Sequence, residues 1–245
     1  GSNTIFSAHG VSDSVESAAK NKSLTVVDAT CPLVKKVHIE AIKYNNQGYK
    51  IILIGHKGHP EVEGTIGRHI NTNFSNIYLV QDDKEAAEIE VSKPSELALV
   101  TQTTLSVDDT KSIINILKKR FPDIKVPKND DICYATQNRQ DAVKQLALES
   151  DYMIVVGSVN SSNSNRLKEL AEKCGCKSVL IDEFEELNLS ELDGCKSIAI
   201  TAGASAPEER VQEIAKALKK HTGAVIIENG EDKENIFFKL PPLLR

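Results

Sequence analysis

The chain has 245 residues, of which 40% are hydrophobic, and this globular composition excludes an intrinsically disordered protein. Its 30 Lys and Arg residues against 35 Asp and Glu residues give a net charge of −5, so no overall basic field attracts nucleic acid or an acidic membrane surface. Aromatic residues make up 4% of the chain, which argues against base-stacking platforms, and no apolar run approaches the ~18 residues of a membrane span.

Short apolar runs alternate with amphipathic stretches along the chain. Most of the apolar runs are continuous in Val, Ile and Leu, as expected for parallel strands covered by helices on both faces. This alternation predicts an α/β fold with parallel sheets. The predicted strands cover residues 24–27, 50–54, 76–80, 97–101, 151–156, 177–181, 197–201 and 224–228. The predicted helices cover residues 11–21, 32–46, 60–66, 107–121, 137–148, 163–173 and 207–221.

The first residues run almost at once into the end of a strand. The chain begins Gly1-Ser2 without Met, and Ile5 and Phe6 read as the last residues of a strand followed by a loop. No signal-peptide pattern is present there. We expect Gly1-Ser2 to be left over from removal of a tag, and the natural protein to extend further upstream.

An internal repeat relates the two halves of the chain. Its offset is 133 − 31 = 102 residues, and such a period indicates two similar modules of about 100 residues. The landmarks lie where strands end, which is where open α/β sheets bind ligands. The offset maps Cys31 with its preceding Asp28 onto Cys133 with Asp130, Gly55 onto Gly157, His59 onto Ser161, and Thr103 onto Ser205.

The repeat also predicts how the chain divides into domains. Residues 1–31 are expected to be the remnant of a first α/β module, and residues 32–128 and 129–217 to be complete second and third modules. Residues 218–245 are expected to form a tail that packs back on the first module. We expect the modules to surround a central cleft.

The cysteines divide into two groups. Cys31 and Cys133 occupy equivalent strand ends, each before a helix, and thiolates in such places favour soft metals and iron–sulfur clusters. The alternative is a pair of incidental or buried thiols. Cys174, Cys176 and Cys195 match nothing in the repeat and are interpreted as structural. An odd number of widely spaced cysteines does not form a secreted disulfide framework, which favours a reducing, cytoplasmic compartment.

Imidazoles and carboxylates gather on one loop that contains His56, His59 and Glu61. A zinc-dependent hydrolase is one interpretation, since His and Glu bind zinc. The loop lacks the zincin spacing, because Gly58 and Pro60 interrupt it. Anion binding by His59 and proton transfer by Glu61 fit the loop better, and solvated surface residues are the remaining alternative.

Hydroxyl and amide side chains dominate the corresponding loop of the third module. Ser161, Ser162 and Asn163 lead directly into a predicted helix, whose N-terminus can bind phosphate. A flexible polar loop with a helix cap is the alternative. Thr103 and Ser205 lie in similar hydroxyl-rich loops. No nucleotide-binding glycine motif is present, so these loops predict a compact anion pocket.

Six segments of this sequence resemble one family. They are FSAHGVS at 6–12, DATCPLV at 28–34, GHKGHPEVEGT at 55–65, TQTTLS at 101–106, DICYAT at 131–136 and NSSNSNR at 160–166. All six are similar to the LytB-type 4-hydroxy-3-methylbut-2-enyl diphosphate reductases, and the resemblance runs from about Ile5 to the C-terminus. These enzymes complete the methylerythritol phosphate route to isoprenoids.

The resemblance implies three α/β modules around a 4Fe–4S cluster that three cysteines hold, with one iron open to substrate. Cys31 and Cys133 match two of these ligands. The third belongs to an N-terminal motif that the 245 residues do not contain, so we expect this chain to lose its cluster and to be an inactive fragment by itself. Thiolate ligation is what keeps such clusters in place.

The resemblance also assigns roles to the other candidates. It implies a reductive dehydroxylation to isopentenyl and dimethylallyl diphosphates, with Thr103 near the substrate hydroxyl and Glu61 as the proton donor. Ferredoxin or flavodoxin is the implied electron donor, in the cytoplasm or the plastid stroma, with no nucleic acid and no membrane as partner. The residues that match diphosphate-binding positions are His9, His59, Ser161, Ser162, Asn163 and Ser205.

Overall fold

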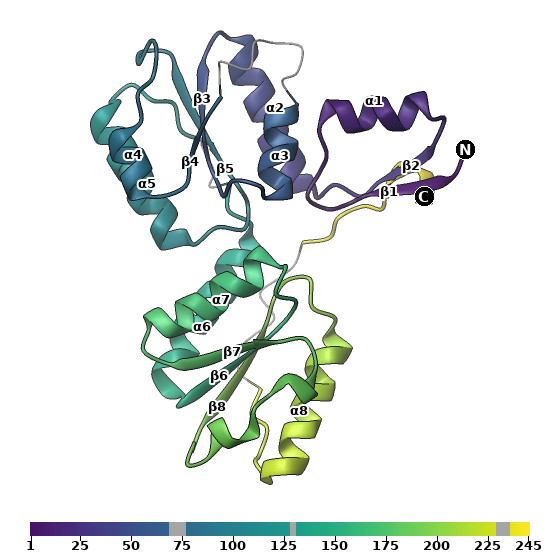
Figure 1. The fold of residues 1–245 in the computed structure, drawn as a ribbon, viewed down its shortest axis with the longest axis vertical. Coiled ribbons are helices and arrows are strands. Elements are labelled where there is room, and N and C mark those ends of the chain that lie inside the picture. Colours follow the sequence, from purple (N-terminus) through teal and green to yellow (C-terminus); the bar gives the residue numbers. More distant parts are fainter. Residues whose placement is uncertain (69–76, 128–130, 229–235) are drawn as a thin grey trace. The chain divides into compact units, whose positions relative to one another are not determined.

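The computed structural model describes residues 1–68, 77–127, 131–228 and 236–245. The chain divides into two compact units (Figure 1). The first unit comprises Gly1–Thr103, Val107–Cys133 and the last residues, Ile236–Arg245. The second comprises Thr104–Ser106 and Tyr134–Asn235.

A three-stranded parallel sheet forms the centre of the first unit. Its order is β4 (Ile77–Val80), β3 (Lys50–Ile54) and β5 (Leu97–Thr101). Successive side chains of a strand point to opposite faces, and the apolar run of β3 is buried on both. Ile51 and Leu53 pack against α2 (Pro32–Asn46) and α3 (Pro60–Gly67), whereas α4 (Asp83–Glu88) and α5 (Val107–Arg120) lie on the other side of the sheet (Figure 1).

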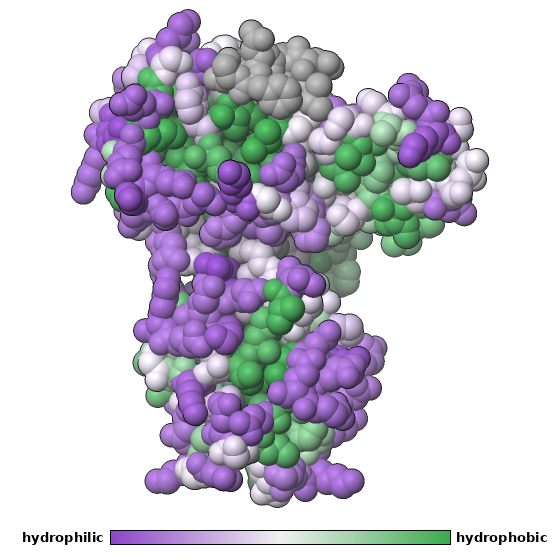
Figure 2. Space-filling view, in the orientation of Figure 1, coloured by the Kyte–Doolittle hydropathy of each residue, from purple (hydrophilic) through white to green (hydrophobic). Residues whose placement is uncertain are grey.

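A smaller βαβ element opens the first unit. Strands β1 (Asn3–Phe6) and β2 (Thr25–Asp28) pair in parallel, with α1 (Asp13–Asn21) between them in the chain. Arg68, at the end of α3, forms ion pairs with Asp13 (3.0 Å) and Glu16 (2.6 Å), so α1 is fixed to α3. Hydrophobic residues cover much of the visible surface of this element (Figure 2), where Ile5 is 71% exposed.

The second unit contains a sheet of the same kind. Strands β7 (Lys177–Ile181), β6 (Tyr152–Val156) and β8 (Ile198–Ala202) are parallel, with β6 in the centre. Met153 and Val155 pack against α6 (Tyr134–Glu149) and α7 (Ser162–Lys173). Residues of the other face pack against α8 (Glu208–Thr222). The described residues also form three short 3₁₀ helices, η2 (Phe184–Glu186), η3 (Leu189–Leu192) and η4 (Pro242–Leu244).

The two sheets share one topology, and the predicted α/β fold with repeated parallel sheets is confirmed. In each sheet the first strand in sequence is central and pairs with the two strands that follow it. Ile51 pairs with Ile77 and Ala98, and Met153, 102 residues later, pairs with Ser178 and Ala199. The domain limits stay a prediction. The predicted limit at 128/129 and the repeat landmark Asp130 lie outside the described residues.

Two parts of the predicted secondary structure differ from the structure. The predicted strand at 224–228 is wrong. Helix α8 ends at Gly223, whose φ of 72° is a left-handed cap, and the following residues pair with no strand, leaving Val225 83% exposed. Helix α4 was not predicted, although Asp82 caps it and Glu85 follows three residues later, which is a helix-start pattern.

Within the described residues, no helix combines the length and the apolar character that crossing a membrane requires.

Candidate active site

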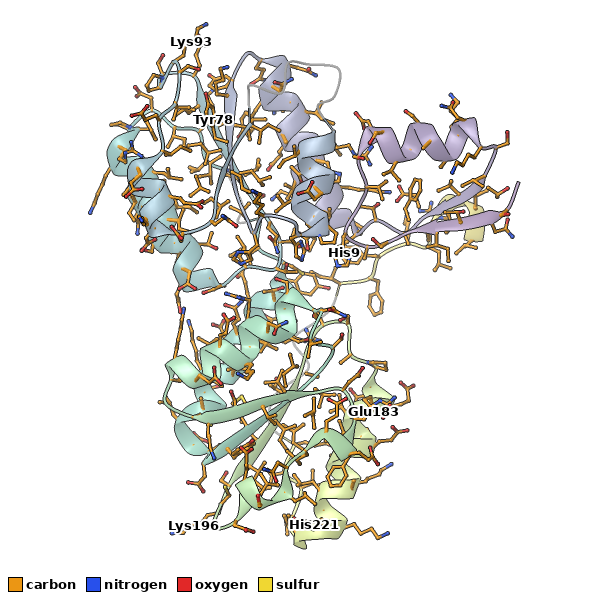
Figure 3. All side chains as sticks on the ribbon, viewed as in Figure 1. His9, Tyr78, Lys93, Glu183, Lys196 and His221 are labelled. Carbon is orange, nitrogen blue, oxygen red and sulfur yellow. The ribbon has the colours of Figure 1, made fainter. Side chains whose placement is uncertain are left out.

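Backbone hydrogen bonds attach both predicted cysteine ligands to loops that carry other candidate residues. The Cys31 N–H donates to the carbonyl of Ala8 at 2.9 Å, next to His9 in the loop after β1 (Figure 3). The Cys133 N–H donates to the carbonyl of Thr103 at 3.0 Å, after β5. Both cysteines are free and partly exposed, and each directly precedes a helix. Their thiols are therefore accessible for ligation.

Two histidines meet edge to face in the first unit. The rings of His9 and His59 have centroids 5.7 Å apart at an interplanar angle of 87°. His59 caps α3, because its Nδ1 accepts a hydrogen bond from the Glu61 N–H at 3.2 Å. Burial of the ring, with His9 and His56 nearby, lowers the pKa of His59 from 6.5 to about 4. At neutral pH the ring is uncharged, and its proton is on Nε2, where it can be donated to an anion.

The lowered pKa of His59 predicts a pH-dependent stability. Between pH 6.5 and about 4 the unfolded chain binds a proton that the folded chain does not, so the free energy of unfolding falls as the pH drops. In His59→Asn the side chain still caps α3 but does not titrate. Denaturant unfolding at several pH values should give a shallower loss of stability for the variant over this range. Parallel profiles would show that His59 titrates normally.

Glu61 and Thr103 form a buried hydrogen-bonded pair, although 42 residues separate them. Glu61 is 4% exposed and lies in the first turn of α3. Its Oε2 accepts hydrogen bonds from the Thr103 N–H and from Oγ1, both at 2.8 Å. These two bonds fix the position of Oε2. Since the Thr103 hydroxyl donates to Glu61, its oxygen can accept a hydrogen bond from a ligand hydroxyl.

The second unit places its candidates at the start of α7. Ser161 caps this helix, its Oγ accepting from the Ser164 N–H at 3.3 Å, and Ser162 accepts a hydrogen bond from Thr104 at 3.4 Å. Asn163 is 4% exposed, yet neither of its amide atoms has a hydrogen-bond partner among the described residues. A buried amide without partners is costly, and this one lies at a helix N-terminus suited to an anion.

Glycines keep the start of α7 close to the sheet. A Cβ atom at Gly157 or at Gly203 would collide with the hydroxyl of Ser164, and Gly203 also lies beside the Asn163 amide. These two glycines follow β6 and β8, so the loops of two strands meet at the helix N-terminus. Ser205 lies in the turn after β8 and is exposed.

The candidate residues are thus distributed over both units. His9, Cys31, His59, Glu61, Thr103 and Cys133 belong to the first unit, and Ser161, Ser162, Asn163 and Ser205 belong to the second. The described residues contain no group of three or more His, Cys, Asp or Glu side chains that could hold a metal ion, so the zinc alternative gains no support from the geometry.

Sequence reasoning missed a buried ion pair beside the site. Asp131, whose side chain is fully buried, accepts from the Lys36 ammonium at 3.2 Å and from the Thr101 N–H at 3.1 Å. Burial raises the pKa of Asp131 to about 6, although Lys36 acts in the opposite direction. The acidic turn before Cys133 was visible in the sequence, but its partner lies 95 residues away and no local pattern identifies it.

Known proteins resemble this chain over nearly its whole length. A family model described as "LytB protein" matches residues 1–219. Proteins named 4-hydroxy-3-methylbut-2-enyl diphosphate reductase are 56% identical in Saccharophagus degradans and 57% identical in Pseudomonas entomophila. Each alignment covers 98% of this chain, and 78% and 76% of the respective relative.

The fold agrees with these sequence matches. The solved structure of the E-1-hydroxy-2-methyl-but-2-enyl-4-diphosphate reductase from Plasmodium falciparum matches with a TM-score of 0.91 at 36% identity. That match covers 98% of this chain and 75% of the other. With a matching family model, close relatives and the same fold, the chain belongs to the LytB family.

Proposed function

We propose that the protein reduces (E)-4-hydroxy-3-methylbut-2-enyl diphosphate to isopentenyl and dimethylallyl diphosphates, the last step of the methylerythritol phosphate route to isoprenoids. The overall reaction consumes two electrons and two protons and releases one water. The observation that carries the proposal is the buried Glu61–Thr103 pair, with Glu61 Oε2 held by two hydrogen bonds of 2.8 Å. Family membership and the names of the relatives support it.

The donor chemistry of the first unit fits an iron–sulfur cluster. Cys31 and Cys133 are free, partly exposed thiols at helix starts, whereas Cys176 is packed in a hydrophobic cluster and burial raises its pKa. Cys174 and Cys195 are also free and partly exposed, but neither lies at the start of a helix, so we assign Cys31 and Cys133 as the ligands. When bound, the cluster supplies single-electron transfer and a Lewis-acidic iron.

We assign diphosphate binding to donors that each unit presents by itself. His59 presents an Nε2–H, and His9 lies beside it. The start of α7 offers backbone N–H groups, the hydroxyls of Ser161 and Ser162, and the Asn163 amide. Ser205 adds a hydroxyl from the turn after β8. Hydrogen bonds to a charged group are stronger than those between neutral groups, so these donors suit an anionic ligand without a cluster of Lys and Arg.

Glu61 donates a proton in the reaction, and Thr103 positions the hydroxyl group that receives it. Oε2 of Glu61 accepts both hydrogen bonds from Thr103, so a proton carried by this carboxyl is on Oε1. Thr103 holds the substrate hydroxyl through its own oxygen, and Glu61 delivers the proton that leaves with that hydroxyl as water. Burial keeps this carboxyl away from bulk solvent. Ferredoxin or flavodoxin supplies the electrons, in the cytoplasm or the plastid stroma.

The test uses the complete enzyme, including the N-terminal cysteine motif that the resemblance implies, with its cluster reconstituted anaerobically. Incubation with the hydroxylated diphosphate and a reduced one-electron dye should yield both isoprenoid diphosphates, with two dye molecules oxidised for each product molecule. Product formation without dye oxidation, or dye oxidation without these products, would contradict the assigned reaction. Omitting the cluster from the same preparation is the control.

A further inference from the structure

One buried carboxylate links the segments that carry the two predicted cysteine ligands. Asp131 lies two residues before Cys133, and its side chain is completely buried. Its Oδ1 accepts from Lys36 at 3.2 Å, and its Oδ2 accepts from the Thr101 N–H at 3.1 Å. Both carboxylate oxygens therefore bind parts of the first unit that are far apart in sequence.

The bond to Thr101 sets the segment before α6 alongside the end of β5. Two residues after this contact, the Cys133 N–H donates to the Thr103 carbonyl at 3.0 Å. Asp131 therefore lies beside Thr101, and Cys133 lies beside Thr103. The same alignment places Cys133 next to the residue whose hydroxyl binds Glu61.

The bond to Lys36 connects Asp131 to helix α2, which begins directly after Cys31. Lys36 lies in α2, five residues after Cys31, which is the N-cap residue of that helix. A rotation or shift of α2 would move both Cys31 and Lys36, because an α-helix is rigid over this short distance. Lys36 is 32% exposed, so the ion pair is partly desolvated, unlike the more exposed pairs on the surface of the molecule.

We propose that the Lys36–Asp131 ion pair is a positioning element that sets the spacing of the Cys31 and Cys133 thiols. This inference rests on the proposed function, in which both thiols bind one cluster. Buried charges are a weak source of stability, and their best-attested role is to select one arrangement of the chain. Here the arrangement selected is that of α2 relative to the Thr103 and Cys133 segments.

The test measures the distance between the two thiols directly in the full chain without metal. A short bis-maleimide joins thiols that lie within its reach, by addition of each thiolate to one ring, and peptide mapping identifies the Cys31–Cys133 product. N-Ethylmaleimide measures the reactivity of each thiol alone. Wild type should form the cross-link. Lys36→Met and Asp131→Asn should form it roughly 10- to 100-fold more slowly, since reactions between held groups depend steeply on their geometry.

Conservative and distant variants separate positioning from general loosening. Lys36→Arg retains the charge and should restore most of the cross-linking rate. Lys168→Met removes one member of an exposed ion pair on α7 and should leave the rate unchanged. The rates with N-ethylmaleimide should stay the same in all variants, because the proposal concerns the spacing of the thiols and not their exposure.

The outcomes distinguish this inference from the proposed function. If wild type forms no Cys31–Cys133 cross-link, the two thiols are too far apart to share a cluster and the proposed function fails. If wild type forms it and both charge-removing variants form it equally fast, the positioning inference alone is overturned. The same conclusion follows if slower cross-linking is accompanied by equally altered N-ethylmaleimide rates, which would indicate unfolding.

Discussion

In the complete enzyme with its cluster reconstituted, Glu61→Gln is expected to lower turnover by about 100- to 10,000-fold, the usual loss when a positioned general acid is removed. The amide keeps the size of the carboxyl group, and its oxygen can still accept from the Thr103 N–H and hydroxyl. The fold and the binding of the diphosphate should therefore be preserved. Steady-state rates with a reduced dye measure turnover, and calorimetric titration with isopentenyl diphosphate measures binding of the diphosphate.

Glu63→Gln provides the matched control for this experiment. Glu63 lies in the same first turn of α3 but is exposed, so its replacement should leave turnover within a factor of about two. Equal losses of turnover in the two variants would mean that turnover depends on the negative charge of this turn, and not on the buried position of Glu61. Full activity of Glu61→Gln would exclude Glu61 as the proton donor.

Asn163→Leu is expected to change stability and ligand binding in opposite directions. The buried amide of Asn163 has no partner among the described residues, so replacing it with an apolar side chain of similar size removes a desolvation cost. The free energy of unfolding without ligand should rise by about 1–3 kcal/mol. Loss of a hydrogen bond to a charged group should weaken binding of isopentenyl diphosphate by roughly 10- to 100-fold.

Asn165→Leu tests whether the expected rise in the free energy of unfolding is specific to position 163. Asn165 lies two residues further along α7, and its amide donates to the carbonyls of Val159 (2.7 Å) and Ser161 (2.8 Å). Its replacement should therefore lower the free energy of unfolding, as measured by urea denaturation. A loss of stability in Asn163→Leu as well would mean that the Asn163 amide is satisfied in the unliganded protein.

The sequence was a good guide to the fold where local pattern and tertiary structure agree. The continuous apolar runs at 50–54 and 97–101 became β3 and β5 with the same limits, because each is buried on both faces. The run at 224–228 is also rich in Val and Ile, but a strand needs a partner as well, and the sequence pattern does not reveal whether one is available. Helix α4 is six residues long, too short for a clear apolar period.

The site was predictable as a set of residues but not as a set of contacts. The resemblance identified Glu61 and Thr103, yet their two hydrogen bonds depend on how α3 and β5 pack. His59 and Ser161 match in the repeat, and the structure shows both as helix caps. By contrast, the pairing of Lys36 with Asp131 comes from tertiary packing over 95 residues, which no periodicity encodes.

The division of the chain into units has a consequence for its synthesis on the ribosome. The second unit lies almost wholly within one continuous stretch, Tyr134–Asn235, so nearly all of it is available before translation ends. The first unit begins the chain but also includes Ile236–Arg245. Domains generally fold in the order in which they emerge, but here the unit that is made first is completed last. Nascent chains stalled before residue 236 should therefore have a protease-resistant second unit and an incomplete first one.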